Sequence, residues 1–309
     1  MCVGKEAHVD GLDRLVVLNK DENSVSFIGT EGGETLRVVL VGAHPHEVAI
    51  TRDGSTAYVS NALGNSVSIL DTGAMEETGR IEHEEFQFPH DLKISPDESK
   101  LYIAVTYAHK VFICERPSHR LLKIVPTGQR LSHMLAPTPD WRRLYVPNLG
   151  SNTLSVLNTE TDEIEKHIVV GRKPEGVAVH PSGAFLYVAN QDEDNVFALS
   201  AEHHGIVARH PVGKTPVRLV FSPDGRYAFT ANRESHDVSV IDTERHWEIK
   251  RIPVGRWPGG IVFDPTGTRA YVANNKTNDV SVIDVQSLRE IERFDAGVHP
   301  DGIGYLSAA

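Results

Sequence analysis

Short apolar runs alternate with turn-forming clusters along most of the chain. Runs such as "GIVF", "AYVA" and "VSVI" are rich in Val, Ile and Tyr, and turns of the Pro-Asp-Gly type separate them. β-Branched and aromatic residues bounded by such turns are typical of β-strands. No stretch with the periodicity of an amphipathic helix competes with this pattern. The pattern therefore predicts an all-β protein.

The apolar runs are organised in a long repeat. The segment "GRWPGGIVFDPTGTRAYVANNKTNDVSVIDVQSLREIERFDAG" (255 to 297) recurs in related form at 171 to 213 and at 213 to 255. A proline near the start of each copy defines a position that we name the proline slot. It is occupied by Pro45, Pro89, Leu131, Pro174, Pro216, Pro258 and Pro300. Four short strands in a copy of about 42 residues match the size of a propeller blade.

Counting the copies predicts a single domain, a seven-bladed β-propeller of four-stranded antiparallel blades. The N-terminal segment holds the last three strands of a blade, and the C-terminal "GVHPDGIGYLSAA" holds a first strand. Pairing these two segments in one composite blade would close the ring and remove exposed sheet edges. The predicted blades are 12–41 plus 297–309, 42–84, 85–127, 128–170, 171–212, 213–254 and 255–296.

The copies "PGGIVFDPTGTRAYVANNKTNDVSVID" and "PEGVAVHPSGAFLYVANQDEDNVFAL" resemble the YVTN-type β-propeller repeat family over nearly the whole chain. This resemblance implies the propeller fold and an exported protein, periplasmic or at the cell surface, with the cytoplasm as the alternative. Similar repeats occur in surface proteins, in accessory proteins of periplasmic redox systems, and more distantly in lactonases and a lyase. A shared fold does not transfer chemistry, so no catalytic residue is carried over from the family.

Bulk composition excludes several classes of partner. The formal net charge is -11 and no run of Lys or Arg could follow a phosphate backbone, so nucleic acid is not expected as a partner. No apolar segment reaches the roughly 20 residues that span a bilayer, so an integral membrane protein is not expected. The only cysteines, Cys2 and Cys114, exclude a disulfide framework. Met1-Cys2 is either a cytosolic start or a Met placed before the Cys of a cleaved lipoprotein leader.

Positions at which the copies differ are where a specific function would be encoded. The loop before the first strand and the loop after the second open on the same ring face, because successive antiparallel strands reverse direction. The first strand is innermost, so its leading loop lies nearest the axis. The two residues after the proline slot read His46-Glu47, His90-Asp91, Ser132-His133, Glu175-Gly176, Val217-Arg218, Gly259-Gly260 and Asp301-Gly302.

Ionisable residues gather on one arc of this axial mouth, and imidazoles with carboxylates suit a divalent transition metal such as Zn, Fe, Cu, Ni or Mn. The predicted metal ligands are His44, His46, Glu47, His90, Asp91, His133 and His299, with Asp301 on the same arc. The catalytic candidates are His133, Glu47, Glu175 and Arg218. The alternative is a hydrated, non-catalytic channel mouth, because only one of two adjacent strand residues can face the axis.

Two functions therefore fit the sequence. The first is a binding propeller that holds a small ligand or a metal ion at the axial mouth, or docks a protein partner on that face. The alternative is a metal-assisted lactone hydrolase or lyase that uses the same residues. Tyr107 and His109 either extend the pocket or face solvent, and Phe88 and Trp257 either form an aromatic rim or pack between blades.

Overall fold

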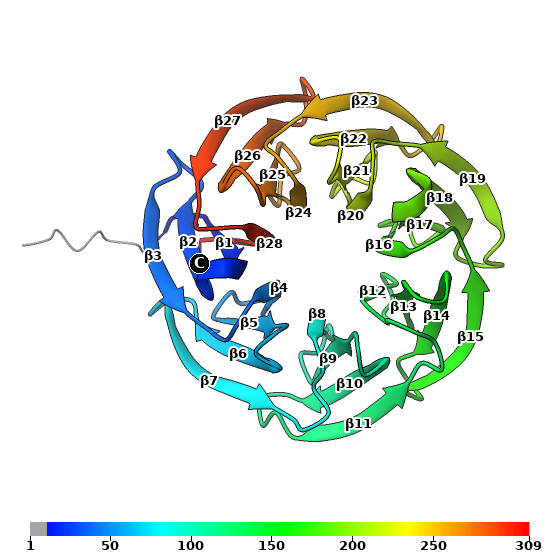
Figure 1. Ribbon diagram of the computed structural model, residues 1–309, viewed down its shortest axis with the longest axis horizontal. Helices are drawn as coiled ribbons and strands as arrows, with labels where there is room; N and C mark the ends of the chain where they lie inside the picture. Colours follow the sequence, from blue (N-terminus) through cyan, green and yellow to red (C-terminus); the bar gives the residue numbers. More distant parts are fainter. Residues whose placement is uncertain (1–10, 309) are drawn as a thin grey trace, which may run out of the picture.

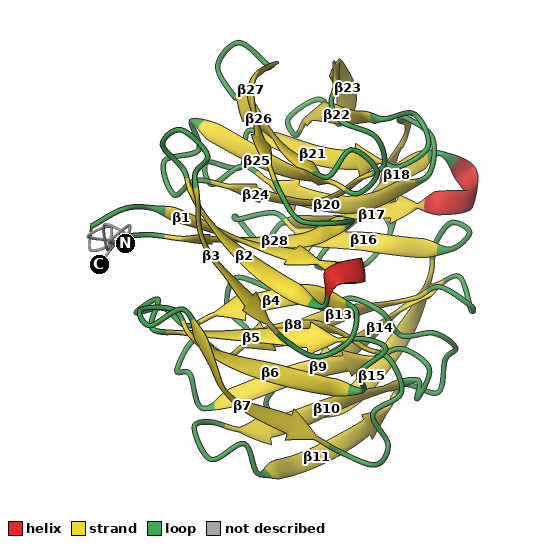
Figure 2. Cartoon of the chain, turned by 60° about the vertical axis from the view of Figure 1, so that its left-hand side comes forward, coloured by secondary structure: helices red, strands yellow, loops and turns green. Residues whose placement is uncertain are grey.

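The computed structural model describes residues 11–308 of the chain as a ring of seven four-stranded antiparallel sheets (Figure 1). The predicted all-β seven-bladed propeller is confirmed. In the described part, the helical segments are two 3-10 turns, η1 (Lys20–Glu22) and η2 (Gln191–Glu193), which lie toward the same face in Figure 2. No helix in residues 11–308 is long and apolar enough to cross a membrane. The interpretation of Met1-Cys2 falls outside the described residues.

We number the blades from the composite one and give the strands of each blade from the axis outward. Blade 1 contains β28 (Pro300–Leu306), β1 (Arg14–Asn19), β2 (Ser24–Gly29) and β3 (Thr35–Leu40). Blade 2 contains β4 (Pro45–Ile50), β5 (Thr56–Asn61), β6 (Ser66–Asp71) and β7 (Glu76–Glu82). Blade 3 contains β8 (Pro89–Ile94), β9 (Lys100–Val105), β10 (Lys110–Glu115) and β11 (Leu121–Pro126). Blade 4 contains β12 (Ala136–Pro137), β13 (Arg143–Asn148), β14 (Thr153–Asn158) and β15 (Glu163–Val169).

The remaining three blades follow the same order. Blade 5 contains β16 (Pro174–Val179), β17 (Phe185–Asn190), β18 (Asn195–Ser200) and β19 (Ile206–Pro211). Blade 6 contains β20 (Pro216–Phe221), β21 (Tyr227–Asn232), β22 (Asp237–Asp242) and β23 (Trp247–Pro253). Blade 7 contains β24 (Pro258–Phe263), β25 (Arg269–Asn274), β26 (Asp279–Asp284) and β27 (Arg289–Asp295).

The two ends of the chain close the ring in blade 1. Strand β28 pairs antiparallel with β1, so that Arg14 lies opposite Leu306 and Val17 lies opposite Ile303. In Figure 1 the red C-terminal strand accordingly lies beside the blue N-terminal one. The predicted closure by the terminal segments is therefore confirmed, and it covers the edge of β1 that would otherwise face the channel.

The apolar core lies between neighbouring blades. Within residues 11–308, the buried apolar side chains form seven clusters, each shared by two adjacent blades. The tyrosine of the second strand is among the largest fully buried side chains in five blades. Because every sheet buries both faces against a neighbour, the inward direction of each innermost strand is fixed by packing on both sides.

A buried asparagine at the end of the second strand holds the start of the blade in place in six blades, whereas blade 3 has Val105 there. Asn61 is fully buried, and its Nδ2 donates to Ser66 Oγ at 3.1 Å and to Ser68 Oγ at 2.9 Å. A Cβ built at Gly42 would lie 2.5 Å from the Asn61 side chain, so only glycine fits where the chain enters the blade. The geometry repeats at Gly171 with Asn190. The repeat therefore encodes scaffold, and it places the residues after the proline slot next to the axis.

Candidate functional site

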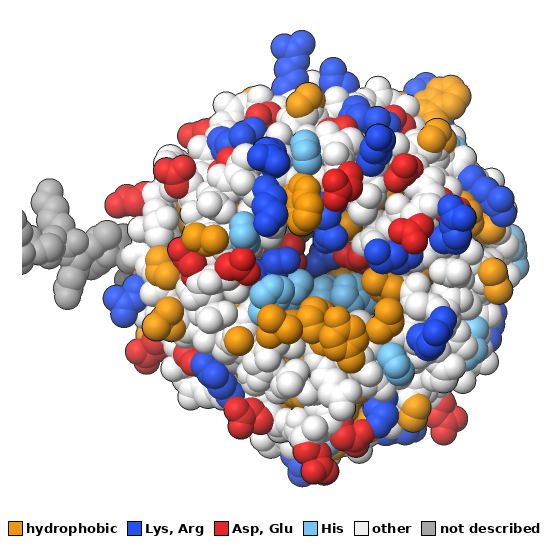
Figure 3. All heavy atoms as spheres, in the orientation of Figure 1, with side chains coloured by type: hydrophobic (Ala, Val, Ile, Leu, Met, Phe, Trp, Pro, Cys, Tyr) orange, Lys and Arg blue, Asp and Glu red, His pale blue; other side chains and the backbone are white. Residues whose placement is uncertain are grey.

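A cavity of about 360 Å³ opens on the axis at the face that carries the loops before the first strands. We name it the axial pocket. It is lined by Lys20, His44, His46, Phe88, His90, Thr106, Tyr107, Leu131, His133, Leu149, Lys173, Glu175, Gln191, Arg218, Arg233, Trp257, Asn275 and Asp301. In Figure 3 the central hollow of this face contains a band of histidines, with basic side chains on one side and hydrophobic ones on the other. The volume is at the lower end of the range typical of small-molecule sites.

The register of blade 4 differs from the sequence prediction. Ser132, not Leu131, bridges to Asn148, as Pro89 pairs with Val105 in blade 3, so Ser132 occupies the proline slot. Leu131 instead has a positive φ of 58°, like the residues that precede the slot in the other blades. The residue after the slot in blade 4 is therefore His133. His133 is therefore equivalent to His46, His90 and Asp301, which directly follow the slot in their blades. Met134, not His133, occupies the second position after the slot, where some other blades have glycine.

A row of three imidazoles forms one wall of the pocket. The ring centroids of His46 and His90 are 4.8 Å apart, and those of His90 and His133 are 3.6 Å apart. All three side chains are at most 8% exposed. Burial lowers the pKa of His46 to about 4 and holds the pKa values of His90 and His133 well below the usual range, so the rings are neutral at pH 7. His46 Nε2 and His90 Nδ1 have no hydrogen-bond partner, whereas His133 Nδ1 lies 3.0 Å from Thr106 Oγ1.

A buried ionic cluster forms the floor of the pocket. The Arg218 guanidinium, 6% exposed, pairs with Glu47, lies 3.3 Å from Glu175 Oε1 and is 4.0 Å from Asp301 Oδ2. Burial opposes the charge of Arg218, but these carboxylates raise the pKa of its guanidinium. Burial also raises the pKa of Glu47 to about 7, only partly offset by Arg218. The catalytic candidates Glu47, Glu175 and Arg218 therefore lie together as one network from three blades.

Asp301 connects the ionic floor to the histidine wall. Its Oδ2 lies 2.9 Å from His46 Nδ1, and its Oδ1 lies 3.4 Å from Lys20 Nζ. Burial alone would raise the pKa of Asp301, but Lys20, His46 and Arg218 hold it well below its usual range. The carboxylate thus lies against the His46 ring, whose Nε2 is buried without a hydrogen-bond partner.

Aromatic and basic side chains form the rim. The Phe88 ring lies 4.8 Å from Tyr107, and Tyr107 is 55% exposed. On the facing side, Lys276 Nζ lies 5.1 Å and the Arg233 guanidinium 6.0 Å from the Trp257 ring. Phe88, Tyr107 and Trp257 all line the pocket.

Sequence reasoning missed the second ring of lining residues. The residue directly after the second strand contributes to the pocket from six blades, as Lys20, Thr106, Leu149, Gln191, Arg233 and Asn275. The sequence contained the signal for these residues, because the loop after the second strand was already expected on the same ring face as the loop before the first strand. Comparing the copies at this one position would have found the basic half of the site.

Other predicted site residues lie away from the pocket or are engaged in structural contacts. Asp91 accepts hydrogen bonds from the backbone N–H of Leu135 at 2.7 Å and from Lys93 Nζ at 2.7 Å, and so joins blades 3 and 4. His299 pairs with Asp21 at the outer rim and does not line the pocket. His109 also lies outside the lining, and its Nδ1 accepts a hydrogen bond from the backbone of Leu131 at 3.0 Å.

The predicted metal site was tested against this geometry. Buried imidazoles are suitable donors for a transition metal. However, the His90 and His133 planes are stacked at 27° rather than converging through their nitrogens. Among residues 11–308, no group of three His, Cys, Asp or Glu side chains is placed to hold an ion. No chemical step is therefore assigned to a metal, and the metal ligands stay a prediction.

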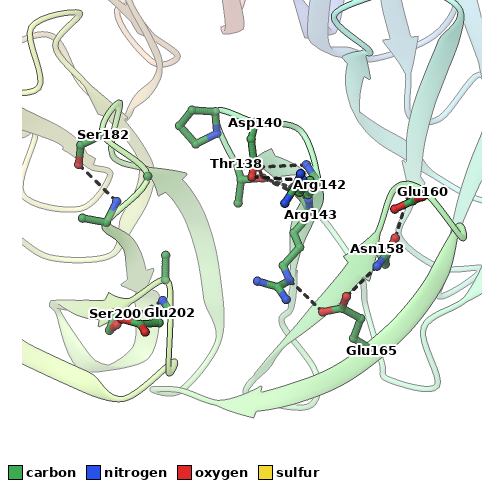
Figure 4. A pocket seen from close by; sticks show the side chains of 14 residues that line it. Thr138, Asp140, Arg142, Arg143, Asn158, Glu160, Glu165, Ser182, Ser200 and Glu202 are labelled. Carbon is green, nitrogen blue, oxygen red and sulfur yellow. Dashed lines mark hydrogen bonds and ion pairs between the residues drawn. The ribbon is translucent and has the colours of Figure 1, made fainter.

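A cavity of about 750 Å³ lies away from the axis between blades 4 and 5 (Figure 4). Its polar groups bind each other. Arg143 Nε donates to Glu165 Oε2 at 2.9 Å, and Asn158 Nδ2 donates to Glu165 Oε1 at 2.8 Å. Thr138 Oγ1 donates to Asp140 at 2.6 Å. The cavity is therefore a polar groove between blades in which these side chains satisfy one another, and the axial pocket is the better candidate site.

The neutral histidine wall predicts that the protein loses stability in mild acid. The unfolded chain protonates His46, His90 and His133 near the usual pKa of 6.5, whereas the folded chain does not. As pH falls from 7 toward 4, protons therefore favour unfolding. Glu47 acts in the opposite sense. Its pKa is raised from the usual 4.5 to about 7 in the folded chain, so between these pH values the folded chain binds one more proton at this group. This single group opposes three histidines. For these four groups alone, a net difference of about two protons corresponds to a loss of roughly 2.7 kcal/mol per pH unit near pH 5.5. Burial also lowers the pKa of other histidines, which act in the same direction; they are His44, His119, His204, His210 and His246.

Urea denaturation at pH 7.5, 6.5 and 5.5 measures this slope. The His133→Gln variant should show a shallower slope, by about one proton. A free energy of unfolding that is constant or increases toward pH 5.5 would contradict the neutral histidine wall.

Comparison with known proteins places the chain in a family. The model of the YNCE-like β-propellers matches residues 54–307. The chain belongs to the YNCE-like β-propeller family. The expected β-propeller repeat family is thus confirmed at this coarser level, whereas the YVTN-type assignment stays a prediction. A comparison with curated protein sequences found no significant match.

Solved structures share the fold at low identity. Hydrazine synthase of Kuenenia stuttgartiensis is 21% identical with a TM-score of 0.78, covering 92% of this chain and 99% of that one. The periplasmic gluconolactonase PpgL of Pseudomonas aeruginosa is 18% identical with a TM-score of 0.81, covering 96% and 100%. A functionally unknown protein of Desulfotomaculum acetoxidans is 15% identical with a TM-score of 0.82, covering 96% and 99%. These likenesses concern the fold alone.

Proposed function

We propose that this YNCE-like β-propeller is a binding protein whose axial pocket holds a small, oxygen-rich organic acid of the sugar-acid class. The observation that carries the proposal is the wall of three buried neutral imidazoles, His46, His90 and His133, which faces basic side chains across one pocket. Ring nitrogens without partners on His46 and His90 lose hydrogen-bond energy that a ligand hydroxyl would restore.

The remaining lining residues support the same ligand chemistry. Lys20, Lys173 and Arg233 supply positive charge for a carboxylate. Gln191 and Asn275 are at most 7% exposed and add amide donors and acceptors for hydroxyl groups. Asp301 is paired with Lys20 and His46, and Glu175 with Arg218 and Arg233, so among the described lining cations Lys173 is the one left to attract an anion.

Calorimetric titration with gluconate, against the uncharged sorbitol, tests this function. We expect saturable binding of gluconate, weaker binding of sorbitol, and at least about a tenfold loss of gluconate affinity in His133→Phe. Arg233→Gln should reduce the preference for gluconate over sorbitol. The matched control is His203→Ala, an exposed histidine outside the pocket, which should bind as the unchanged protein does. Equal binding by His133→Phe and the unchanged protein would contradict the proposal.

Lactone hydrolysis is the second candidate, and the pair of His46 and Asp301 favours it. A carboxylate 2.9 Å from Nδ1 orients the imidazole, and Nε2 is left to accept a proton from a water that attacks a lactone carbonyl. The likeness to a gluconolactonase supports the fold required and nothing finer. If the activity exists, His46→Gln should reduce the rate of glucono-δ-lactone opening by about 10²-fold or more in a pH-stat assay. A rate equal to the uncatalysed one leaves binding as the function.

The predicted metal ion and the docking of a protein partner on this face remain further proposals. Elemental analysis of protein purified without a histidine tag or added metal tests the ion. A near-stoichiometric transition metal that is lost in a folded His46→Ala and His90→Ala double variant would favour the metal-assisted version. Metal-free protein, or metal retained in that variant, would favour binding of an organic ligand by the imidazoles themselves.

A further inference from the structure

The axis opens a second time at the opposite face, where a cavity of about 360 Å³ lies beneath the ionic cluster. We name it the second pocket. It is lined by the far halves of the innermost strands, and its walls are largely aliphatic. The principal wall residues are Val48, Val177, Val179, Val220, Ile261 and Ile303. Its size matches that of the axial pocket, but it has none of the histidines or aromatic side chains found there.

Arg218 separates the two pockets and lines both of them. Its terminal nitrogens are engaged by Glu47 and Glu175, whereas its Nε has no hydrogen-bond partner although the side chain is only 6% exposed. A buried N–H without an acceptor costs about 1–3 kcal/mol. An oxygen at the inner end of the second pocket would supply the missing acceptor.

Charge balance defines what kind of oxygen fits. Both cations that line the second pocket already have carboxylate partners, because Lys93 Nζ lies 2.7 Å from Asp91 Oδ1 and Arg218 pairs with Glu47. An anionic head group would meet Glu47 without a free counter-charge among the described lining residues. A neutral carbonyl oxygen accepts a hydrogen bond without adding charge, and an aliphatic body would bury the surrounding Val and Ile side chains.

We propose that the second pocket binds a neutral, mainly aliphatic molecule with one carbonyl oxygen, which accepts a hydrogen bond from Arg218 Nε. This site is independent of the sugar-acid function proposed for the axial pocket, since it uses the opposite mouth and different wall residues. The two ligands would approach the same guanidinium from opposite sides.

Titration with 2-nonanone, followed by ligand-observed NMR, tests the second pocket in the full-length chain. We expect saturable binding that weakens by at least about tenfold in Val220→Lys, which places a charge on a partly exposed wall position. The matched control is Tyr107→Lys at the axial pocket, which should bind 2-nonanone as the unchanged protein does. Val179→Lys serves as a second wall variant if circular dichroism finds Val220→Lys unfolded.

Three results would overturn the proposal. The first is the absence of saturable binding to the unchanged protein. The second is an equal loss in the wall variants and in Tyr107→Lys. The third is tighter binding of nonanoate than of 2-nonanone, because an anionic head would then be preferred over a neutral carbonyl.

Discussion

Deletion of residues 298–309 is expected to abolish the cooperative thermal unfolding transition of the protein. This segment contains β28, which pairs with β1 and completes blade 1 from the inside. Without it, the edge of β1 opens onto the channel, although Leu15, Val16 and Val17 are fully buried in the intact ring. Blades 2 and 7 also lose their neighbour, because β28 contacts both β4 and β24.

We expect the loss to exceed about 5 kcal/mol, beyond the range of single substitutions, because a whole strand and two interfaces are removed. Circular dichroism melts of the truncated and full-length chains measure the effect. Addition of a synthetic peptide of residues 298–309 should restore part of the transition. A truncated chain that melts within a few degrees of the full-length chain would contradict closure by this strand.

Replacement of Arg218 by Leu is expected to destabilise the protein by about 3–5 kcal/mol, because it leaves buried carboxylates without their cation. Glu47 and Glu175 contact the guanidinium directly, and Asp301 lies 4.0 Å from it. Arg218→Lys should lose less, since it retains the charge but not the fork of donors.

The control for Arg218 is Arg143→Leu in the groove between blades 4 and 5. Arg143 pairs with Glu165 at a side-chain exposure of 40%, so its removal should cost less than about 1 kcal/mol. Urea denaturation of both variants gives the comparison. Equal free energies of unfolding for Arg218→Leu and Arg143→Leu would contradict the ionic floor.

The sequence was sufficient for the architecture because the repeat is regular and physically redundant. Each copy carries its own strand pattern and turn residues, and all but the copy of blade 3 carry the buried asparagine, so one ambiguous copy cannot change the fold. Blade 4 illustrates the limit. Its innermost strand β12 has only two residues, and the copy was misaligned by one position between Leu131 and Ser132. Aligning Thr138-Pro139 with Ser95-Pro96 in the following turn would have corrected it.

The candidate site was predictable only in part, because alternation along a strand identifies the inward residue but not its partners. His46, His90 and Asp301 follow the proline slot directly and line the axial pocket as a comparison of copies would suggest. The contact of Arg218 with Glu47 joins positions 171 residues apart. Such a contact depends on the position of each residue along the ring axis and on how far its side chain reaches toward that axis. No period in the sequence encodes it.

The central claim, that the axial pocket is the binding site, is tested most directly by NMR of protein labelled with ¹⁵N in its histidine rings during titration with gluconate. We predict that the ring signals of His46, His90 and His133 shift together with saturation. The signals of His119 and His204, which contact Tyr58 and Tyr145 and lie outside the pocket, should stay in place. Saturable shifts confined to His119 and His204, or no shift of any pocket histidine, would contradict the claim.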